Sequence, residues 1–152
     1  MKVSTRVEYG LIALTDIAIN CEDGRTVSSA DIAQRQNISQ KYLEQIIMGL
    51  RQGGFVRGHK GSRGGYMLSR PASKIYLSEI LNALDNSILA DVHDEFDQEE
   101  GDKGDIRSSV NTCLWDKLNG YMRTFTGQLT LADLINEYKG SSGEEKNYMY
   151  YI

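Results

Sequence analysis

The chain has 152 residues, of which 40% are hydrophobic and 25% charged, an ordinary composition for a globular protein of one compact domain or a small domain with an extension. No apolar run approaches the roughly 20 residues that a membrane-spanning helix needs, and the opening residues lack the apolar core of a signal peptide, so we expect a cytoplasmic protein that does not contact a membrane. The formal net charge of −4 is unevenly divided, because residues 1–70 hold ten basic and six acidic side chains whereas residues 71–152 hold seven and fifteen.

Residues 4–20 are predicted to form the first helix. Their apolar side chains recur at helical spacings, at Val7, Leu11, Leu14 and Ala18. The polar stretch 20–24 ends this helix at a turn glycine. Thr26 and Val27 follow it as candidates for a short strand.

A helix-turn-helix unit is predicted after this break. Ser28 and Asp31 fit the start of a short helix, in which the serine oxygen accepts from the backbone and the acid lies at the positive helix end. Residues 37–39 form a tight turn, and Ser39 is expected to cap a third helix over about residues 40–52. The apolar stripe of this third helix consists of Leu43, Ile46, Ile47 and Leu50. Two short helices joined by such a turn are typical of helix-turn-helix proteins.

A β-hairpin wing is predicted next. A glycine pair directly after residue 52 ends the third helix. Residues 55–57 and 66–69 have the composition of strands, and the turn 59–65 between them is basic and rich in glycine. Pro71, the only proline in the sequence, stands at the exit of this hairpin, where a missing N–H is tolerated.

The second half of the chain is predicted to hold a short helix over residues 77–84, an acidic loop and a long helix. Residues 91–105 contain eight acidic side chains and few apolar ones, which is typical of a mobile loop. The long helix covers about residues 108–127 and carries an apolar seam of Val110, Leu114, Leu118, Tyr121, Phe125 and Leu129. So much apolar surface is buried either by a second copy of the helix in a homodimer, which we favour, or by folding back on its own domain.

A final helix is expected to be capped by Thr130 and to end at the glycine- and serine-rich residues 140–143. These elements predict a mainly α fold with a small β-hairpin wing, that is, a winged helix-turn-helix with a long dimerisation helix. The predicted division is a winged helix-turn-helix domain at 1–85, a flexible acidic loop at 86–107, the dimerisation and C-terminal helices at 108–139, and a tail at 140–152.

The basic half of the chain predicts a DNA-binding face. Residues 25–70 hold eight basic and two acidic side chains, and this local charge of +6 would attract a polyanion whatever the charge of the whole chain. The residues expected to read base edges in the major groove are Ser39, Gln40, Lys41, Tyr42, Glu44 and Gln45. Phosphate contacts are expected from Lys2, Thr5, Arg6, Ser39 and Arg51, and minor-groove or backbone contacts from Lys60 and Arg63 in the wing. Each residue alone is as well explained by an ordinary solvated surface, but together they predict binding to double-stranded DNA.

No enzymatic motif accompanies this pattern. The sequence has no nucleophile elbow, no phosphate-binding loop and no paired carboxylates on a rigid frame. The glycine-rich turn 61–65 joins two strands rather than a strand and a helix, so it is not a nucleotide cradle. We therefore expect that the protein is not an enzyme.

Several short motifs occur along the chain in a fixed order. They are Ser4-Thr5-Arg6-x-x-Tyr9-Gly10, Ile38-Ser39-x-x-Tyr42-Leu43-Glu44-Gln45, Leu50-Arg51-x-x-Gly54, Lys60-Gly61-x-x-Gly64-Gly65-Tyr66, Leu114-Trp115 and Leu129-Thr130-Leu131-x-x-Leu134. In this combination the chain resembles the family of winged-helix regulators that includes CymR, IscR and NsrR. The resemblance implies a transcription repressor that binds a palindromic operator as a homodimer, with the long helix as the dimer interface.

The resemblance also raises the question of an iron–sulfur cluster. The iron–sulfur members of that family use three closely spaced cysteines before the long helix, where this chain has only Cys113, with His93 about where the first cysteine would be. Such clusters ordinarily take four ligands, mostly thiolates, so this set is poor even if Glu8 or aspartates join it. We expect no cofactor and no metal site, with a cluster that senses redox state or nitric oxide as the alternative. Cys21 is expected to be an unreactive loop thiol, with oxidant sensing as its alternative.

The sequence ends in Tyr148-Met149-Tyr150-Tyr151-Ile152, an aromatic segment that is costly to leave in water. Either this segment packs back on its own dimer, or it binds a pocket of a partner. The ending closely resembles that of CymR, the repressor of cysteine metabolism. That resemblance implies regulation of cysteine and sulfur genes and a partner enzyme, O-acetylserine thiol-lyase, which accepts peptides ending in isoleucine. We expect Ile152 and the aromatic residues before it to dock in that enzyme.

Overall fold

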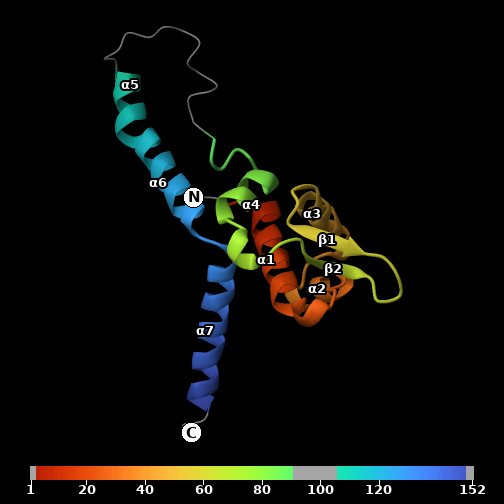
Figure 1. Cartoon of the computed structure of the whole chain (residues 1–152). Helices are drawn as coiled ribbons and strands as arrows, with labels where there is room; N and C mark the ends of the chain where they lie inside the picture. Colours follow the sequence, from red (N-terminus) through yellow and green to blue (C-terminus); the bar gives the residue numbers. More distant parts are fainter. Residues whose placement is uncertain (1–2, 91–105, 150–152) are drawn as a thin grey trace.

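The computed structural model describes residues 3–90 and 106–149, with Glu22 and residues 143–149 described by their backbone alone. The elements are, in order, α1 (Thr5–Asn20), a 3-10 turn (Glu22–Gly24), α2 (Ser29–Gln36), α3 (Gln40–Gln52), β1 (Val56–His59), β2 (Gly65–Leu68), a second 3-10 turn (Ala72–Lys74), α4 (Leu77–Leu84), α5 (Ile106–Val110), a π-helical stretch (Asn111–Trp115), α6 (Asp116–Gln128) and α7 (Leu131–Met149). This mainly helical architecture with one antiparallel hairpin confirms the predicted fold class (Figure 1).

The first three helices begin and end where local side-chain chemistry directs them. The Ser4 hydroxyl accepts from the Val7 N–H at 3.3 Å, and the Ser28 hydroxyl accepts from the Asp31 N–H at 3.1 Å, which satisfies N–H groups that the first helical turn leaves free. Asn37 adopts the left-handed conformation, with φ of 53°, and turns the chain from α2 into α3. Ser39 occupies the cap position of α3 as predicted, but its side chain makes no capping hydrogen bond.

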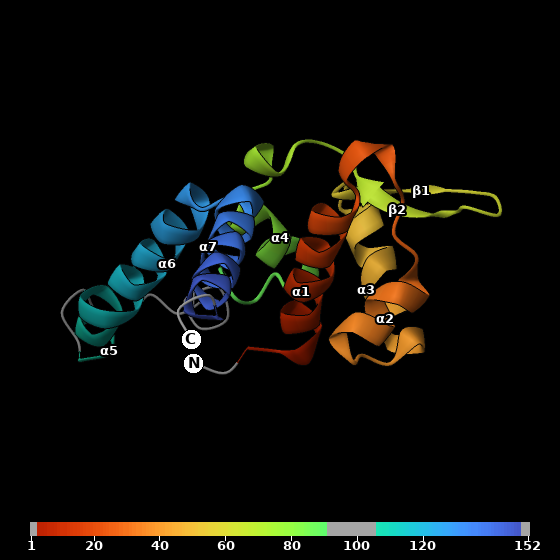
Figure 2. The same cartoon turned by 90° about the horizontal axis from the view of Figure 1, so that it is seen from below.

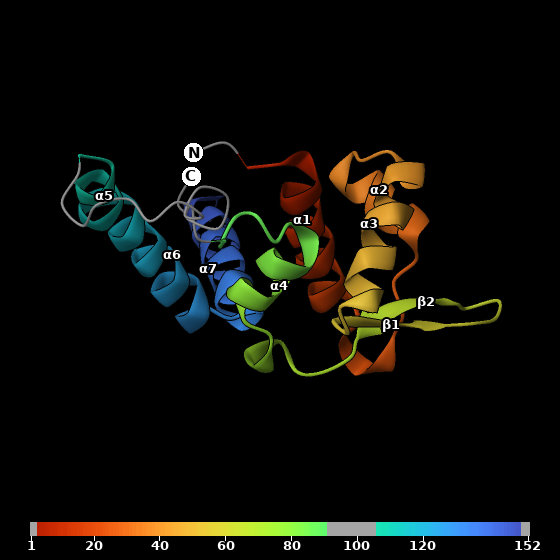
Figure 3. The ribbon, with the colours of Figure 1, turned by 90° about the horizontal axis from the view of Figure 1, so that it is seen from above.

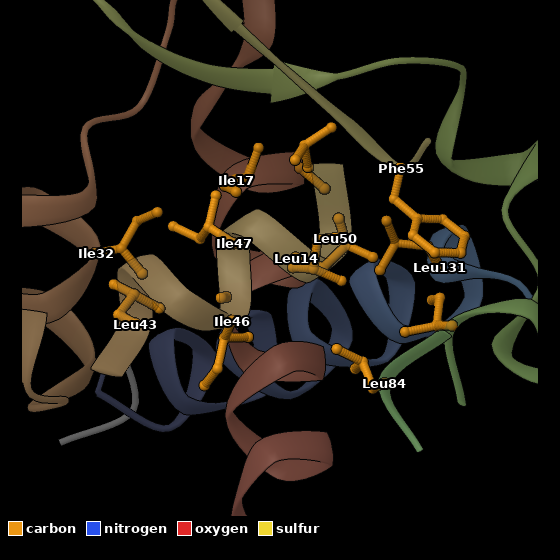
Figure 4. Close-up of a cluster of buried hydrophobic side chains, with 14 of the residues drawn as sticks. Leu14, Ile17, Ile32, Leu43, Ile46, Ile47, Leu50, Phe55, Leu84 and Leu131 are labelled. Atoms are coloured by element: carbon orange, nitrogen blue, oxygen red, sulfur yellow. The ribbon is translucent and has the colours of Figure 1, made fainter. Parts of the chain in front are cut away.

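One core holds the helices together. The apolar stripe of α3, predicted as Leu43, Ile46, Ile47 and Leu50, is buried against Leu14 and Ile17 of α1 and Ile32 of α2 (Figure 4). Leu131, at the start of α7, is fully buried in the same core. Burying a leucine or isoleucine side chain stabilises a fold by about 1.5–3 kcal/mol. The burial of its four-residue stripe therefore fixes α3 firmly against α1 and α2.

The start of α7 is tied into this core by backbone pairing as well as by Leu131. The Leu77 N–H donates to the Leu129 carbonyl at 2.9 Å, and the Leu131 N–H donates to the Ile75 carbonyl at 2.8 Å. Thr130 caps α7 as predicted, because its hydroxyl accepts from the Asp133 N–H while the Asp133 carboxylate accepts from the Thr130 N–H.

The β-hairpin is a wing that projects beside α3. Its strands pair antiparallel, with Val56 opposite Leu68 and His59 opposite Gly65. Val27 makes an isolated bridge to Tyr66, with N–H to carbonyl distances of 2.9 and 2.8 Å, so the short strand expected at Thr26 and Val27 is reduced to a single bridging residue. Figure 2 and Figure 3 show the hairpin at one end of the molecule and α5 at the other.

The long helix forms over residues 106–128, close to its predicted bounds, and a π-helical stretch interrupts it. Its seam is exposed in the single chain, with Tyr121 72% and Phe125 61% accessible. Arg123 anchors the helix to the chain after α4, because its Nε and Nη2 donate to the Leu89 carbonyl at 3.2 and 2.9 Å. The predicted acidic loop at 91–105 lies outside the described residues.

The prediction that the last helix ends at residues 140–143 is wrong, because α7 continues to Met149. A glycine inside a helix costs only about 1 kcal/mol relative to alanine, and no proline follows to stop the helix. The Ser141 hydroxyl, moreover, donates back to the Glu137 carbonyl one turn earlier. The segment 140–149 is therefore helical rather than an irregular tail.

Candidate nucleic-acid interface

The outer face of α3 is polar and lies opposite the stripe that packs into the core. Lys41, Gln45, Met48 and Gln52 are exposed along it. Because seven residues make about two helical turns, Lys41 and Met48 lie on one line along the helix axis. This face presents a cation, an amide and a thioether to solvent at the spacing of a single helical stripe.

Glu44 is held in position by two side chains. Its Oε1 accepts a hydrogen bond from the Ser29 hydroxyl at 3.2 Å and one from the Gln40 amide at 3.1 Å. Ser29 opens α2, so this contact joins the two helices of the unit at the exposed edge. A carboxylate fixed in this way is a preorganised acceptor, and cytosine N4 is the base-edge donor that such an acceptor matches.

Tyr42 does not lie on the exposed face where we expected it. Its ring is half-buried against the core and meets Tyr9 edge to face, with ring centroids 6.1 Å apart and an interplanar angle of 70°. Edge-to-face packing of this kind stabilises the contact between α1 and α3. Position 42 falls at the boundary between the buried and exposed faces, and the sequence pattern did not resolve on which side the ring would lie.

Arg6 lies against the other flank of α3. A Cβ built at Gly49 would stand 3.0 Å from the Arg6 Nη2, so the missing side chain of Gly49 makes room for this guanidinium. Thr5 and Arg51 are exposed as expected, whereas Lys2 lies outside the described residues.

The wing and the loop before α2 enclose a basic hollow of about 810 Å³. Lys60 and Arg63, predicted from the sequence, line it together with Arg25 and His59, and Asp31 contributes one acidic group. The Thr26 hydroxyl donates to the Arg63 carbonyl at 2.7 Å and fixes the wing turn to that loop. A smaller hollow of about 320 Å³ beside it is lined by Ser29, Arg51 and His59, among others.

Arg25 and His59 were missed as candidate DNA contacts. Arg25 was available from the sequence as one of the eight basic residues in the segment of net charge +6, but it is brought to the wing by the bridge between Val27 and Tyr66 and by the hydrogen bond from Thr26 to Arg63. The hollow is lined by cations on both sides, which suits it to a phosphate group.

An ion pair between a buried carboxylate and a partly exposed guanidinium fixes α2 relative to α1. Asp16, only 4% exposed, accepts from Arg35 Nη2 at 2.7 Å and Nε at 3.0 Å, and from the Gln36 amide at 2.8 Å. Burial by itself raises the pKa of Asp16, but the hydrogen bonds from Arg35 and Gln36 outweigh it and bring this pKa below its ordinary value. The carboxylate is therefore ionised and holds the C-terminal turn of α2 in place.

The two cysteines are both free and lie in different parts of the chain. Cys21 is half-buried after α1, with its Sγ 3.9 Å from the Ala18 carbonyl, and Cys113 is exposed in the π-helical stretch. Across the described part of the chain, no three His, Cys, Asp or Glu side chains come close enough together to hold a metal ion. His93 lies outside that part.

The predicted partner-binding segment is described only in part. Tyr148 and Met149 belong to the last turn of α7 by their backbone, and Tyr150, Tyr151 and Ile152 lie outside the described residues. None of the helices within residues 3–90 and 106–149 combines the length and apolar character needed to cross a membrane.

Comparisons with known proteins agree with this arrangement. The profile of the Rrf2 family, described as iron-dependent transcriptional regulator, matches residues 3–137. The transcriptional regulator IscR of Cereibacter sphaeroides is 38% identical over 136 residues, which cover 89% of this chain and 87% of that protein. These relatives are named as transcriptional regulators rather than enzymes.

Two solved structures share the fold. That of CymR, described as the global cysteine regulator of B. subtilis, superposes with a TM-score of 0.73 at 27% identity and covers 90% of this chain and 98% of its own. That of T. potens IscR superposes with a TM-score of 0.74 at 31% identity and covers 93% and 90%. The chain is thus similar both to a regulator of cysteine and to IscR proteins.

Proposed function

The chain belongs to the Rrf2 family of DNA-binding transcriptional regulators, and on that premise we propose that it represses genes of cysteine and sulfur metabolism as a homodimer on a palindromic operator. One observation carries the DNA-reading part of this proposal: Arg51 of α3 and Lys60 of the wing line one hollow together with Ser29, which also donates a hydrogen bond to Glu44 on the polar face of α3. A recognition helix enters the major groove with such a face while flanking cations meet the phosphates. The similarity to CymR over 98% of that chain supports the cysteine assignment.

The exposed seam of the long helix supports the homodimer. Val110, Leu114, Leu118, Tyr121 and Phe125 recur at three- and four-residue spacings along it, and each is at least 43% exposed. Apolar side chains in such a line pair with an identical line across a two-fold axis. A two-fold dimer places two recognition helices against two half-sites, and the operator is then palindromic.

Introducing charged side chains into the seam tests whether the seam forms the dimer interface. We expect Leu118→Glu together with Phe125→Glu to convert a dimer into a monomer in light scattering at micromolar concentration, because burying two carboxylates in an apolar interface is costly. Thr124→Glu is the matched control for Phe125→Glu alone, since it places one carboxylate at the neighbouring position but off the seam. A monomeric wild-type protein would contradict the proposed assembly.

Selection of DNA from a random pool tests operator binding. The full chain should enrich sites with two inverted half-sites, and the seam variant should lose them. Enrichment of sites without inverted symmetry would contradict the palindromic operator. If no sequence were enriched, sequence-specific binding by the outer face of α3 would be contradicted.

We propose further that the protein works without a resident cofactor. Its two cysteines lie in separate elements, and Cys113 is the only one near the expected cluster position, so the donor set does not fit a cluster held mainly by thiolates. The second candidate function is an iron–sulfur or nitric-oxide-responsive regulator, and the 38% identity to an IscR protein favours it. Iron analysis and a visible spectrum of anaerobically purified protein separate the two, because a colourless, iron-free sample excludes the cluster.

The partner that we propose is O-acetylserine thiol-lyase, bound through Tyr148, Met149, Tyr150, Tyr151 and Ile152. The similarity to the cysteine regulator supports this choice, because an enzyme of cysteine synthesis would report the supply of cysteine. Deleting residues 148–152 should abolish capture of the purified enzyme in a pull-down while DNA binding persists. Capture that survives the deletion would contradict docking by this segment.

A further inference from the structure

Met48 is an apolar side chain on an otherwise polar surface. It is 55% exposed, although methionine is usually buried, and its exposed neighbours on α3 are Lys41, Glu44, Gln45 and Gln52. No packing within the described chain accounts for an apolar residue at this place. The role of Met48 therefore depends on what this face of α3 binds.

Helical spacing places Met48 in the middle of the outer face. It lies four residues after Glu44 and three after Gln45, so all three share one side of α3. Leu43, Ile46, Ile47 and Leu50 occupy the opposite side and are buried. When the outer face lies in a major groove, Met48 points at base edges rather than at the phosphates.

Among the base edges of the major groove, only thymine presents an apolar group. Its 5-methyl stands beside acceptors and donors that the neighbouring Lys41, Glu44 and Gln45 are able to meet. A thioether side chain is flexible and polarizable and fits such a methyl without a fixed geometry. Met48 has no strong hydrogen-bonding group, so the other base edges would leave their polar atoms unpaired against it.

We propose that Met48 is a specificity-determining residue that reads the 5-methyl group of one thymine in each half-site. This inference rests on the proposed function, because it requires α3 to enter the major groove. Met48 would add a base preference that the polar residues of α3 alone would not give. The inference therefore predicts a thymine at a fixed position in each half-site.

Uracil substitution tests the contact directly, because deoxyuridine pairs as thymidine does and lacks only the methyl. We would replace each thymine of the selected operator by deoxyuridine in turn and measure the affinity of the full chain. One position per half-site should lose about fourfold in affinity, the effect of removing one buried methyl. Met48→Gln should bind the normal and the uracil operator equally, whereas Met48→Leu should keep most of the difference.

The controls separate this inference from the proposed function. Since Met48 is exposed, all three proteins should unfold at the same denaturant concentration, so a loss of discrimination is not a loss of fold. If the wild type binds no operator, the proposed function fails and the inference with it. Suppose instead that the wild type binds its operator, but that at every position it loses the same affinity on uracil substitution as Met48→Gln does. That result overturns the inference and leaves the proposed function standing.

Discussion

Gly65 and Val27 approach so closely that a Cβ at Gly65 would stand 2.7 Å from the Val27 carbonyl oxygen. The two backbones meet where Val27 bridges Tyr66, so this approach joins the wing to the loop before α2. The basic hollow lies directly beside it, since Arg25 and Arg63 belong to the two segments that are joined.

We predict that Gly65→Ala loosens the wing. The added methyl group forces apart two backbones that have no flexible side chain to yield, and overpacking of this kind typically costs about 1–3 kcal/mol. Operator affinity should fall together with the free energy of unfolding in urea. Gly58→Ala is the matched control in the same hairpin, because its Cβ would lie 3.7 Å from the Tyr66 ring, an ordinary contact. Equal effects of the two substitutions would refute the close-approach argument.

Removing one partner of the pair between Asp16 and Arg35 should destabilise the fold. Arg35→Ala leaves a carboxylate that is 4% exposed without its bidentate partner. Breaking a fully buried pair costs about 3–5 kcal/mol, and we expect about 2 kcal/mol here because Arg35 is partly exposed. Arg35→Lys keeps the charge without the bidentate geometry and should lose less. Chemical denaturation measures both, and an unchanged midpoint for Arg35→Ala would contradict the role of the pair.

The same pair gives a pH dependence with a defined sign. The pKa of Asp16 is lower in the folded state than its ordinary value, so the unfolded chain takes up the proton first as the pH falls. The stability difference between the wild type and Asp16→Asn should be constant from about pH 8 to pH 5 and shrink below about pH 4. A difference that grows on acidification would show that the carboxylate is not stabilised by its partners.

The salt dependence of operator binding measures how many phosphate contacts the basic hollow at the wing makes. Each lost phosphate contact reduces the slope of log affinity against log salt by about 0.9. We expect Arg63→Ala and Arg25→Ala each to reduce it by about this amount per protomer. Lys74→Ala, in the 3-10 turn before α4, should leave it unchanged. If Arg25→Ala has no effect, the hollow does not hold a phosphate.

The sequence predicted most of the fold because its elements follow local rules. The caps at Ser28 and Thr130 and the apolar stripe of α3 are short-range patterns, and α2, α3 and α7 begin where these patterns placed them. The predicted C-terminal end of α7 is wrong because it, too, was based on local rules. Glycines at 140 and 143 are local stop signals, but flanking helix-forming residues outweigh them.

The candidate site was less predictable, because several of its features depend on contacts between distant residues. Arg25 reaches the wing through the bridge from Val27 to Tyr66 and the hydrogen bond from Thr26 to Arg63, and Tyr42 turns inward because Tyr9 receives its ring. The ion pair of Asp16 joins residues 19 positions apart and carries no sequence pattern of its own. Met48 could have been found from the sequence as the one apolar residue on the outer stripe of α3.

Mapping the DNA that the protein occupies in cells shows whether it acts on genes of cysteine and sulfur metabolism through this face. We expect inverted-repeat sites upstream of such genes, with occupancy lost in a Lys41→Ala, Arg63→Ala double variant that still folds. Sites confined to genes of iron–sulfur assembly, or occupancy that survives the double variant, would contradict it.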